Sequence, residues 1–409
     1  METSGCSTAF TASTGFIEGT GGIKGIEGID DFFLEKLRKK NIHTLTAIQK
    51  MVIPHILAKK NILFRSETGT GKTFAYLLPV LQNLVDDNDI AGCCRVLVVS
   101  PTLELCSQIK KESDFLLEDL EINGHPVKSL LISGGGSIDR QIQGIRKDKP
   151  AIIAANTGRL LQLVNMNRLK LHKLEYLILD EADRLTSDEL WEETHELARR
   201  VNTSARRIAC SATIPPKIRP RLDLLMGEAL FCESDEQEIL RNNITHWAIW
   251  AEDRDKINAL RSFLSAAHPK KTLVFSERAE SICEIVSKLN HHKYGAAGIY
   301  SGMEKKERKN ALDCFRSGKV PVLVSSDLSA RGLDIENITH IVSIGVHCDS
   351  EVYIHRAGRT ARAGKRGVMV SIGNEQDLRR LRAIEKKLSI VVYPKILYKG
   401  KICSPDEFE

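Results

Sequence analysis

The stretch Ser66-Glu67-Thr68-Gly69-Thr70-Gly71-Lys72-Thr73 combines glycines, hydroxyl side chains and one lysine in an order suited to holding phosphate. It follows an apolar run and precedes a segment of helical period, the setting that a phosphate-binding loop requires. Glycines let backbone N–H groups surround the phosphates, and the helix N-terminus adds its dipole. Lys72 is predicted to reach the β- and γ-phosphates, and the Thr73 hydroxyl to ligate Mg²⁺. Ser66 replaces the first glycine of the usual pattern. The predicted nucleotide contacts in this loop are Ser66, Thr68, Gly69, Thr70, Gly71, Lys72 and Thr73.

A second cluster, Asp180-Glu181-Ala182-Asp183, follows an apolar run directly. Acids at the end of a buried parallel strand lie at the carboxyl edge of the sheet, where a phosphate loop of the same sheet also lies. Asp180 is predicted to hold Mg²⁺ through its water shell, and Glu181 to orient the attacking water and accept its proton. An acidic cluster alone is more often a helix cap or a solvated turn, so the upstream loop is what favours catalysis.

Arg359 and Arg362 are the candidate cations of the second half of the chain. Their spacing places them on one face of a helical turn, and planar guanidinium groups suit phosphate oxygens. An arginine that acts across a gap between domains is an arginine finger, worth about 10³–10⁵ in rate. A solvated basic helix face is the alternative. The presence of Lys72 and Asp180 upstream favours the catalytic interpretation.

The elements that must position these residues alternate along the chain. Short apolar runs and segments of helical period follow one another, which predicts an α/β fold with mostly parallel sheets flanked by helices. Predicted strands are 61–65, 95–100, 129–133, 151–156, 176–180 and 207–211, then 272–275, 320–326, 340–344 and 367–372. Predicted helices include 73–86, 105–117, 304–316 and 376–388.

A polar, charged stretch at 233–243 interrupts this pattern and is predicted to be a linker. The sequence therefore divides into a flexible N-terminal segment (1–28), an N-terminal domain (29–232), the linker, a C-terminal domain (244–390) and a short tail (391–409). The formal charge of +6 is compatible with a nucleic-acid partner without requiring one. Scattered cysteines, and the lack of a secretory signal or of an apolar run long enough to span a bilayer, favour a cytoplasmic location. The chain is expected to be a monomer.

With these motifs in this order, the sequence resembles the DEAD-box RNA helicases of superfamily 2, whose family letters stand here at 180–183. The similarity runs from about Phe32 to Leu388. It implies two RecA-like domains, hydrolysis of the ATP β–γ phosphoanhydride with Mg²⁺, and RNA as the partner. The RNA would be a single strand or short duplex, bound largely without regard to sequence, and protein regulators are compatible with the family.

The resemblance also assigns individual roles. Gln49 would read adenine, since an amide both donates and accepts. Phe32 would stack on the base, and Asp334 would bind the ribose hydroxyls. The family's coupling residues correspond to Asp183, Ser211, Thr213 and His355, and its RNA contacts to Pro101, Thr102, Gly134, Gly135, Asn156, Gly158, Arg159 and Ser326. Leu103, Asn156 and Lys305 depart from the usual arginine, threonine and glutamine. For each RNA loop taken singly, an ordinary turn remains an equal alternative.

Three functions are compatible with these residues: an RNA-dependent ATPase that unwinds locally, an ATP-gated RNA clamp with slow turnover, and a DNA-directed motor of the same superfamily. Glu181, Arg359 and Arg362 are all present, which favours hydrolysis over a passive clamp. Gln49 and the Asp-Glu-Ala-Asp string argue against the DNA motor.

Overall fold

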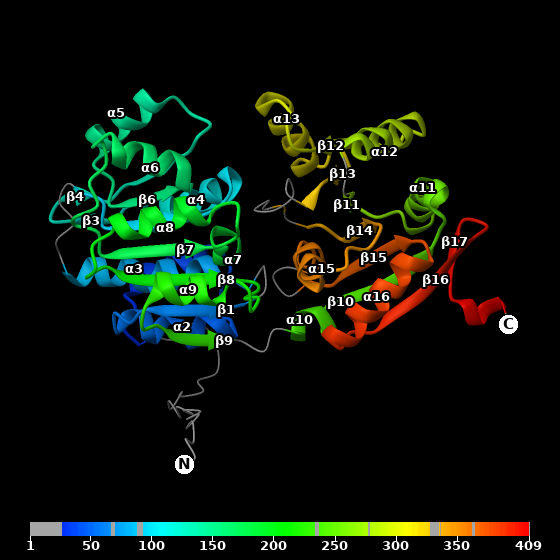
Figure 1. The fold of residues 1–409 in the computed structure, drawn as a ribbon, viewed down its shortest axis with the longest axis horizontal. Helices are drawn as coiled ribbons and strands as arrows, with labels where there is room; N and C mark the ends of the chain where they lie inside the picture. The colour runs from blue at the N-terminus through cyan, green and yellow to red at the C-terminus, as the bar shows by residue number, and fades with distance from the viewer. Residues whose placement is uncertain are drawn as a thin grey trace, which may run out of the picture.

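The computed structural model describes residues 27–66, 70–87, 93–233, 237–276, 279–327, 335, 337–361 and 365–408. Four predicted site residues, Thr68, Gly69, Asp334 and Arg362, lie outside the described residues, as does most of the predicted N-terminal segment. Their roles stay predictions. The described chain forms two lobes, each built on one large sheet (Figure 1).

The first lobe, residues 27–233, contains a seven-stranded sheet in the order β5-β6-β2-β7-β8-β1-β9. All its strand pairs are parallel. The strands are β1 (Ile62–Arg65), β2 (Val96–Val99), β5 (Ser129–Ile132), β6 (Ile152–Ala155), β7 (Tyr176–Asp180), β8 (Arg206–Ser211) and β9 (Leu230–Glu233). A small hairpin, β3 (Glu121–Ile122) and β4 (His125–Pro126), lies apart from this sheet. Most strands are short and apolar because helices cover both faces.

The helices of the first lobe form two layers. The core on one face includes side chains from α1 (Asp31–Lys39), α2 (Ala47–Leu57), α3 (Lys72–Asp87) and α4 (Leu103–Leu117). The core on the other face includes side chains from α6 (Thr157–Asn165), α7 (Ala182–Leu185), α8 (Trp191–Arg200) and α9 (Arg219–Met226), with α5 (Ile138–Asp148) packed at its margin. The sheet edge between these layers carries the predicted nucleotide loop.

The second lobe, residues 237–408, contains an eight-stranded sheet in the order β12-β13-β11-β14-β15-β10-β16-β17. Its strands are β10 (Ile244–Trp250), β11 (Thr272–Phe275), β12 (Ala296–Ile299), β13 (Val322–Ser325), β14 (His340–Ile344), β15 (Gly367–Gly373), β16 (Val392–Tyr398) and β17 (Lys401–Cys403). Only the β16–β17 pair is antiparallel. The α/β class with mostly parallel sheets is therefore confirmed in both lobes.

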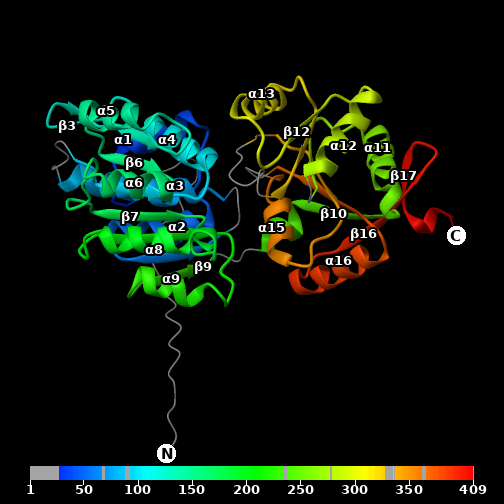
Figure 2. The ribbon, with the colours of Figure 1, turned by 45° about the horizontal axis from the view of Figure 1, so that its top comes forward.

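Helices cover the second sheet on both faces as well. One core includes side chains from α13 (Lys305–Arg316), α15 (Ser350–Ala357) and α16 (Glu375–Leu388), and the other from α11 (Lys256–Ala267) and α12 (Ala279–His291). The helices α10 (Gln237–Asn242), η1 (Asp253–Asp255) and η3 (Pro405–Phe408) complete the lobe. Figure 2 shows the two lobes side by side, with α15 on the side of the second lobe that faces the first.

Two segments differ from the sequence prediction. The predicted linker contains α10, and Leu240 of this helix is buried in a core of the second lobe. The predicted short tail supplies β16, which pairs with β10 in the register His246↔Val392, and β17. Pro394 in the middle of β16 hides the strand from a sequence pattern, because proline is unusual inside a sheet. The proposed domain boundaries stay predictions at these two points.

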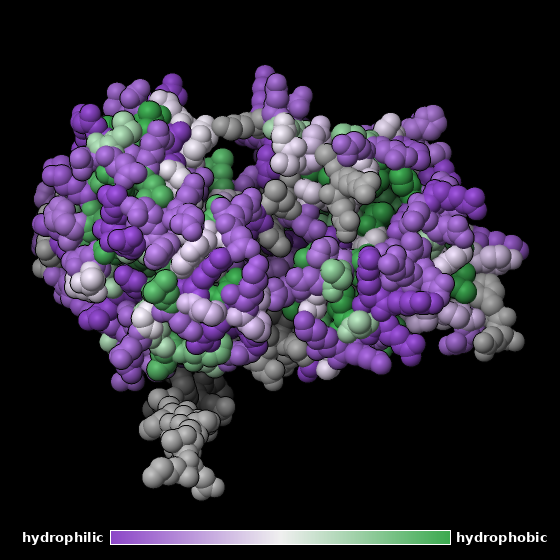
Figure 3. All heavy atoms as spheres, viewed as in Figure 1, coloured by the Kyte–Doolittle hydropathy of each residue, from purple (hydrophilic) through white to green (hydrophobic). Residues whose placement is uncertain are grey.

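The outer surface is mostly polar. On the face shown in Figure 3, hydrophilic residues dominate and hydrophobic ones form scattered small groups. Within the described ranges, no helix combines the length and apolar character that crossing a bilayer requires.

Candidate active site

The predicted phosphate loop lies between β1 and α3, as expected. Lys72 opens α3, and its Nζ donates to the carbonyl oxygen of Ser66 at 2.7 Å. The hydroxyls of Ser66 and Thr70 lie 2.7 Å apart. Gly71 has φ of +82°, and a Cβ atom there would lie 2.4 Å from Nε2 of Gln49. The positive φ favours glycine at 71, and the Gln49 amide would have to move to admit a side chain there.

Gln49 contacts this loop directly. Its Nε2 donates to the Gly71 carbonyl at 3.0 Å, and its Oε1 accepts from the Thr46 N–H at 3.0 Å, within a capping box at the start of α2. One N–H donor and one lone pair of the amide remain for a base. Phe32 does not line the cavity described below; its ring packs edge-on against Phe33, with Lys36 over its face. Its predicted stacking role gains no support from this geometry.

The acidic cluster begins where β7 ends. Asp180 is only 3% exposed, and its Oδ1 accepts from the Glu181 N–H at 2.9 Å. Glu181 has φ of +52°, a left-handed conformation that is rare for a residue with a side chain and is typical of functional sites. Burial raises the pKa of Glu181, and the charge of Arg359 opposes that rise. A carboxylate with a raised pKa suits a proton acceptor.

The predicted coupling residues are brought together. Asp183 Oδ2 accepts from Thr213 Oγ1 at 2.9 Å and lies 3.4 Å from Nε2 of His355. Burial acts to raise the pKa of Asp183, but hydrogen bonds from His355, Ser211 and Thr213 outweigh it and hold this pKa below its ordinary value. Asp183 is therefore an anion that joins β8 of the first lobe to α15 of the second.

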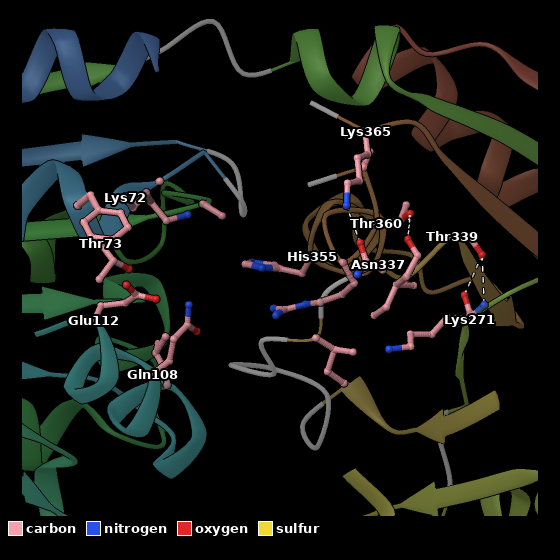
Figure 4. Close-up of a pocket in the computed structure, with 18 of the residues that line it drawn as sticks. Lys72, Thr73, Gln108, Glu112, Lys271, Asn337, Thr339, His355, Thr360 and Lys365 are labelled. Carbon is pink, nitrogen blue, oxygen red and sulfur yellow. Dashed lines mark hydrogen bonds between the residues drawn. The ribbon is translucent and has the colours of Figure 1, made fainter. Parts of the chain in front are cut away.

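A cavity of about 940 Å³ lies between the lobes (Figure 4). The first lobe contributes Lys72 and Thr73 together with Asp180 and Glu181. His355 projects toward them from the second lobe, and Arg359 lines the same cavity and is 5% exposed. Sequence reasoning did not identify the other polar and charged lining residues, which include Lys40, Gln108, Glu112, Lys270, Lys271, Asn337, Lys365 and Arg366. They lie outside every recognised motif, so the chain alone gave no signal for them.

The predicted RNA-contacting loops lie on the first lobe, except Ser326, which follows β13. Thr102, next to Pro101, caps α4 by accepting from the Leu105 N–H at 3.3 Å. Arg159 donates to the carbonyls of Gly134 and Gly136 at 3.3 and 3.0 Å. Its guanidinium therefore holds the glycine loop in place, a role that a motif string does not reveal.

The other predicted RNA contacts in these loops differ in exposure and in hydrogen bonding. Gly134 and Gly135 are exposed. Asn156 precedes α6 without a side-chain capping bond, and its Oδ1 is buried with no protein partner. At Gly158, a Cβ atom would lie 3.2 Å from Oε1 of Glu193. Asn156 therefore keeps polar capacity that the protein does not use, and Gly158 lies close to the Glu193 carboxylate.

A second contact between the lobes was missed by sequence reasoning. Arg308 of α13 donates through Nε and Nη2 to Oε1 of Glu104 in α4, at 2.7 and 2.6 Å. Both side chains are about one-fifth exposed. Glu104 follows Leu103, where the family pattern has arginine, and Arg308 stands where the family also has arginine. The sequence therefore showed both residues, but not that they meet.

The oxygen donors around the loop fit Mg²⁺. This ion is held by one or two carboxylates, by waters and by substrate phosphates. Asp180 supplies a carboxylate and Thr73 a hydroxyl at the same cavity. Among the described residues there is no group of three or more His, Cys, Asp and Glu side chains that could hold a metal alone. A site completed by the nucleotide is thus compatible with these residues.

Fold and site together define a pair of RecA-like domains with an ATP-binding loop in the first. Residues 46–220 match the family DEAD/DEAH box helicase, and residues 255–364 match the helicase conserved C-terminal domain. The chain is 32% identical over 369 residues to the DEAD-box ATP-dependent RNA helicase CshC of Bacillus cereus, covering 90% of this chain and 92% of that protein. It is also 32% identical over 361 residues to CshA of Bacillus cereus, covering 88% of this chain and 67% of CshA.

Solved structures agree on the fold. Mss116 bound to single-stranded RNA and UDP-BeF matches with a TM-score of 0.79 at 24% identity, covering 91% of this chain and 79% of that one. S. cerevisiae Dbp5 bound to RNA and ADP BeF3 matches with a TM-score of 0.77 at 21% identity, covering 90% and 94%. The chain belongs to the DEAD-box family of ATP-dependent RNA helicases, which confirms the family that the motifs indicated.

Proposed function

We propose that this helicase closes its two lobes on one ATP and one RNA strand, and that hydrolysis reopens them after local strand separation. The observation that carries the proposal is the shared cavity, in which Lys72 and Glu181 of one lobe face His355 and Arg359 of the other. Neither lobe alone supplies both the phosphate loop and the cation opposite it. Ligands that bind across such a cleft each favour closure, so each raises the affinity for the other.

The proposed chemistry is an in-line displacement. A water oxygen attacks the γ-phosphorus, the bond from that phosphorus to the β–γ bridging oxygen breaks, and Glu181 takes the proton of the water. Lys72 contacts the β- and γ-phosphates, and Arg359, with Arg362 as predicted, meets the charge that spreads over the γ-phosphoryl oxygens. Thr73 and Asp180 would hold Mg²⁺, which neutralises phosphate charge when bound. Gln49 reads adenine, and Asp334 binds the ribose.

RNA is proposed to lie along the loops that contain Thr102, Gly134, Gly135 and Asn156, and to reach Ser326 on the second lobe. Mss116 and Dbp5, which share the fold, were solved with RNA bound, which supports this choice of partner. Contacts to phosphates carry no sequence information, so binding is proposed to be largely independent of sequence and weakened by salt. Closure on a bent strand would displace the complementary strand of a short duplex.

A monomer in a reducing compartment such as the cytoplasm is the proposed setting. The cysteines of the described residues are all unpaired, and Cys94, Cys106 and Cys210 are buried, where a disulfide would need rearrangement. Sedimentation of the purified chain with and without reductant tests both points. A stable dimer, or a disulfide formed in the cell, would contradict this setting.

ATP turnover with RNA, with matched single-stranded DNA and without nucleic acid tests the function. We expect RNA alone to stimulate turnover, and Lys72→Ala to abolish it. Equal rates under all three conditions would leave a nucleotide-binding protein without coupling. Glu181→Gln should retain ATP binding and accumulate the closed RNA complex, which native gels detect. Wild-type turnover by this variant would remove Glu181 from the mechanism. Rapid duplex separation distinguishes unwinding from the alternative, an ATP-gated clamp that turns over slowly.

A further inference from the structure

Within the part of the chain that the structure describes, three hydrogen bonds hold the carboxylate of Asp180, and two of them come from side chains outside the family motifs. The Tyr76 hydroxyl donates to Oδ2 at 2.9 Å, and the Cys210 thiol donates to Oδ1 at 3.1 Å. The third donor is the Glu181 N–H, also to Oδ1. Tyr76 and Cys210 are both fully buried, so water does not compete for these bonds.

The two side chains come from the elements that form the nucleotide site. Tyr76 lies one helical turn beyond Lys72 in α3. Cys210 lies on β8 directly opposite Asp180 in the parallel register. The hydroxyl of Tyr76 therefore joins α3 to Asp180, the carboxylate that the proposed function assigns to Mg²⁺.

These bonds use most of the hydrogen-bond acceptor positions of the Asp180 carboxylate. A carboxylate has about four lone-pair positions. Oδ1 has both of its positions filled by Cys210 and Glu181, and Oδ2 has one filled by Tyr76. A single position on Oδ2 remains for a water bound to a metal ion. The carboxylate is thus fixed in rotation and presents one defined direction.

We propose that Tyr76 and Cys210 are positioning residues that orient Asp180 for the nucleotide-bound Mg²⁺. This inference rests on the proposed function of Asp180. Neither side chain touches substrate; each acts through a hydrogen bond to a residue that does. Partners of this kind typically set metal affinity by about 10–100-fold.

The test follows binding of the fluorescent nucleotide N-methylanthraniloyl-ATP as MgCl2 is titrated, with a second measurement in EDTA. Tyr76→Phe keeps the ring and removes only the hydroxyl. We expect it to raise the Mg²⁺ midpoint, the MgCl2 concentration at which nucleotide binding is half enhanced, about tenfold. The affinity for the nucleotide in EDTA should stay unchanged. Cys210→Ala should raise the midpoint about threefold, because a thiol is a weak donor. Cys210→Ser, which keeps a donor, should restore the wild-type midpoint.

Tyr176→Phe is the matched control. Tyr176 lies in the same lobe, is buried, and its hydroxyl accepts from Nδ2 of Asn83 at 2.7 Å rather than contacting Asp180. We expect its Mg²⁺ midpoint to equal that of the wild type. Identical midpoints for Tyr76→Phe and wild type would overturn the inference, as would an equal shift in Tyr176→Phe or a lower affinity in EDTA.

Lys72→Ala separates this inference from the proposed function. If Lys72→Ala binds the nucleotide as well as the wild type does, the proposed phosphate site itself is wrong. If Lys72→Ala loses binding while Tyr76→Phe keeps the wild-type midpoint, only the positioning role fails. Thermal unfolding of each variant confirms that the fold is retained.

Discussion

The ion pair between Glu104 and Arg308 should control how readily the two lobes close. Its two short N–H···O contacts join α4 of the first lobe to α13 of the second. Neither residue belongs to the nucleotide loop at 66–73. Glu104→Gln removes the charge and keeps the shape of the side chain. We expect the variant to bind ATP and RNA separately as the wild type does, but to lose part of the cooperativity between them.

The structure sets the expected size of this loss. Exposed ion pairs contribute about 0.2–1 kcal/mol, whereas removing one partner of a buried pair costs about 3–5 kcal/mol. The Arg308 and Glu104 side chains are 21% and 20% exposed, so the pair lies between these limits. We expect about 1.5 kcal/mol, and since about 1.4 kcal/mol is a factor of ten, cooperativity should fall roughly tenfold.

A double-mutant cycle measures this energy. RNA affinity is measured with and without a non-hydrolysable ATP analogue for the wild type, Glu104→Gln, Arg308→Gln and the double variant, at one salt concentration. Arg316→Gln is the matched control, because Arg316 lies on the same helix and pairs within that helix, with Asp313 at 3.7 Å. A coupling energy below about 0.3 kcal/mol, the level of additive independent sites, would refute the reasoning. So would an equal loss in Arg316→Gln.

Three further predictions concern single side chains. Arg356→Met should lower the free energy of unfolding by about 3 kcal/mol, because it leaves Asp327 without two contacts of 2.6 Å; a denaturant-measured loss below about 1 kcal/mol would contradict this. Burial lowers the pKa of His246, so stability should fall as pH drops below about 6.5, by up to about 1.4 kcal/mol per pH unit. His246→Gln should reduce the slope of unfolding free energy against pH by the equivalent of one proton. If the variant and the wild type have the same slope, other groups cause the pH dependence. Leu103→Arg should steepen the salt dependence of RNA binding by about 0.7 in the log–log slope, and an unchanged slope would place residue 103 away from the RNA.

The strings whose place in the fold the sequence predicted are contiguous and lie at the ends of strands. The loop around Lys72 and the acids after Tyr176 each follow a short apolar run, and parallel strands bring such ends to one edge. Sequence could not show what packs around them. The contact of Tyr76 with Asp180 depends on which face α3 turns toward β7, and that is decided by packing of the whole lobe.

The same limit applies to two residues whose predicted roles gain no support from the geometry. Phe32 has a suitable residue type and spacing, but spacing along a chain does not fix the direction of a ring, and this ring lies beside Lys36. Arg159 looks like a phosphate ligand because guanidinium groups suit phosphate, yet its donors are used by carbonyls of the glycine loop. Contacts between the lobes depend on tertiary geometry that no local pattern contains.

The contacts across the cleft are suited to the reversible closure that we propose. Asp183–His355 lies beside the nucleotide cavity, and Glu104–Arg308 lies where α4 meets α13. Both contacts join polar or charged groups, and interfaces of this kind between domains are typical of parts that move relative to each other. Water can replace each partner when the lobes separate. A cleft closed by apolar side chains would bind its ligands and hold them, whereas one closed by exchangeable charges can release them after each hydrolysis.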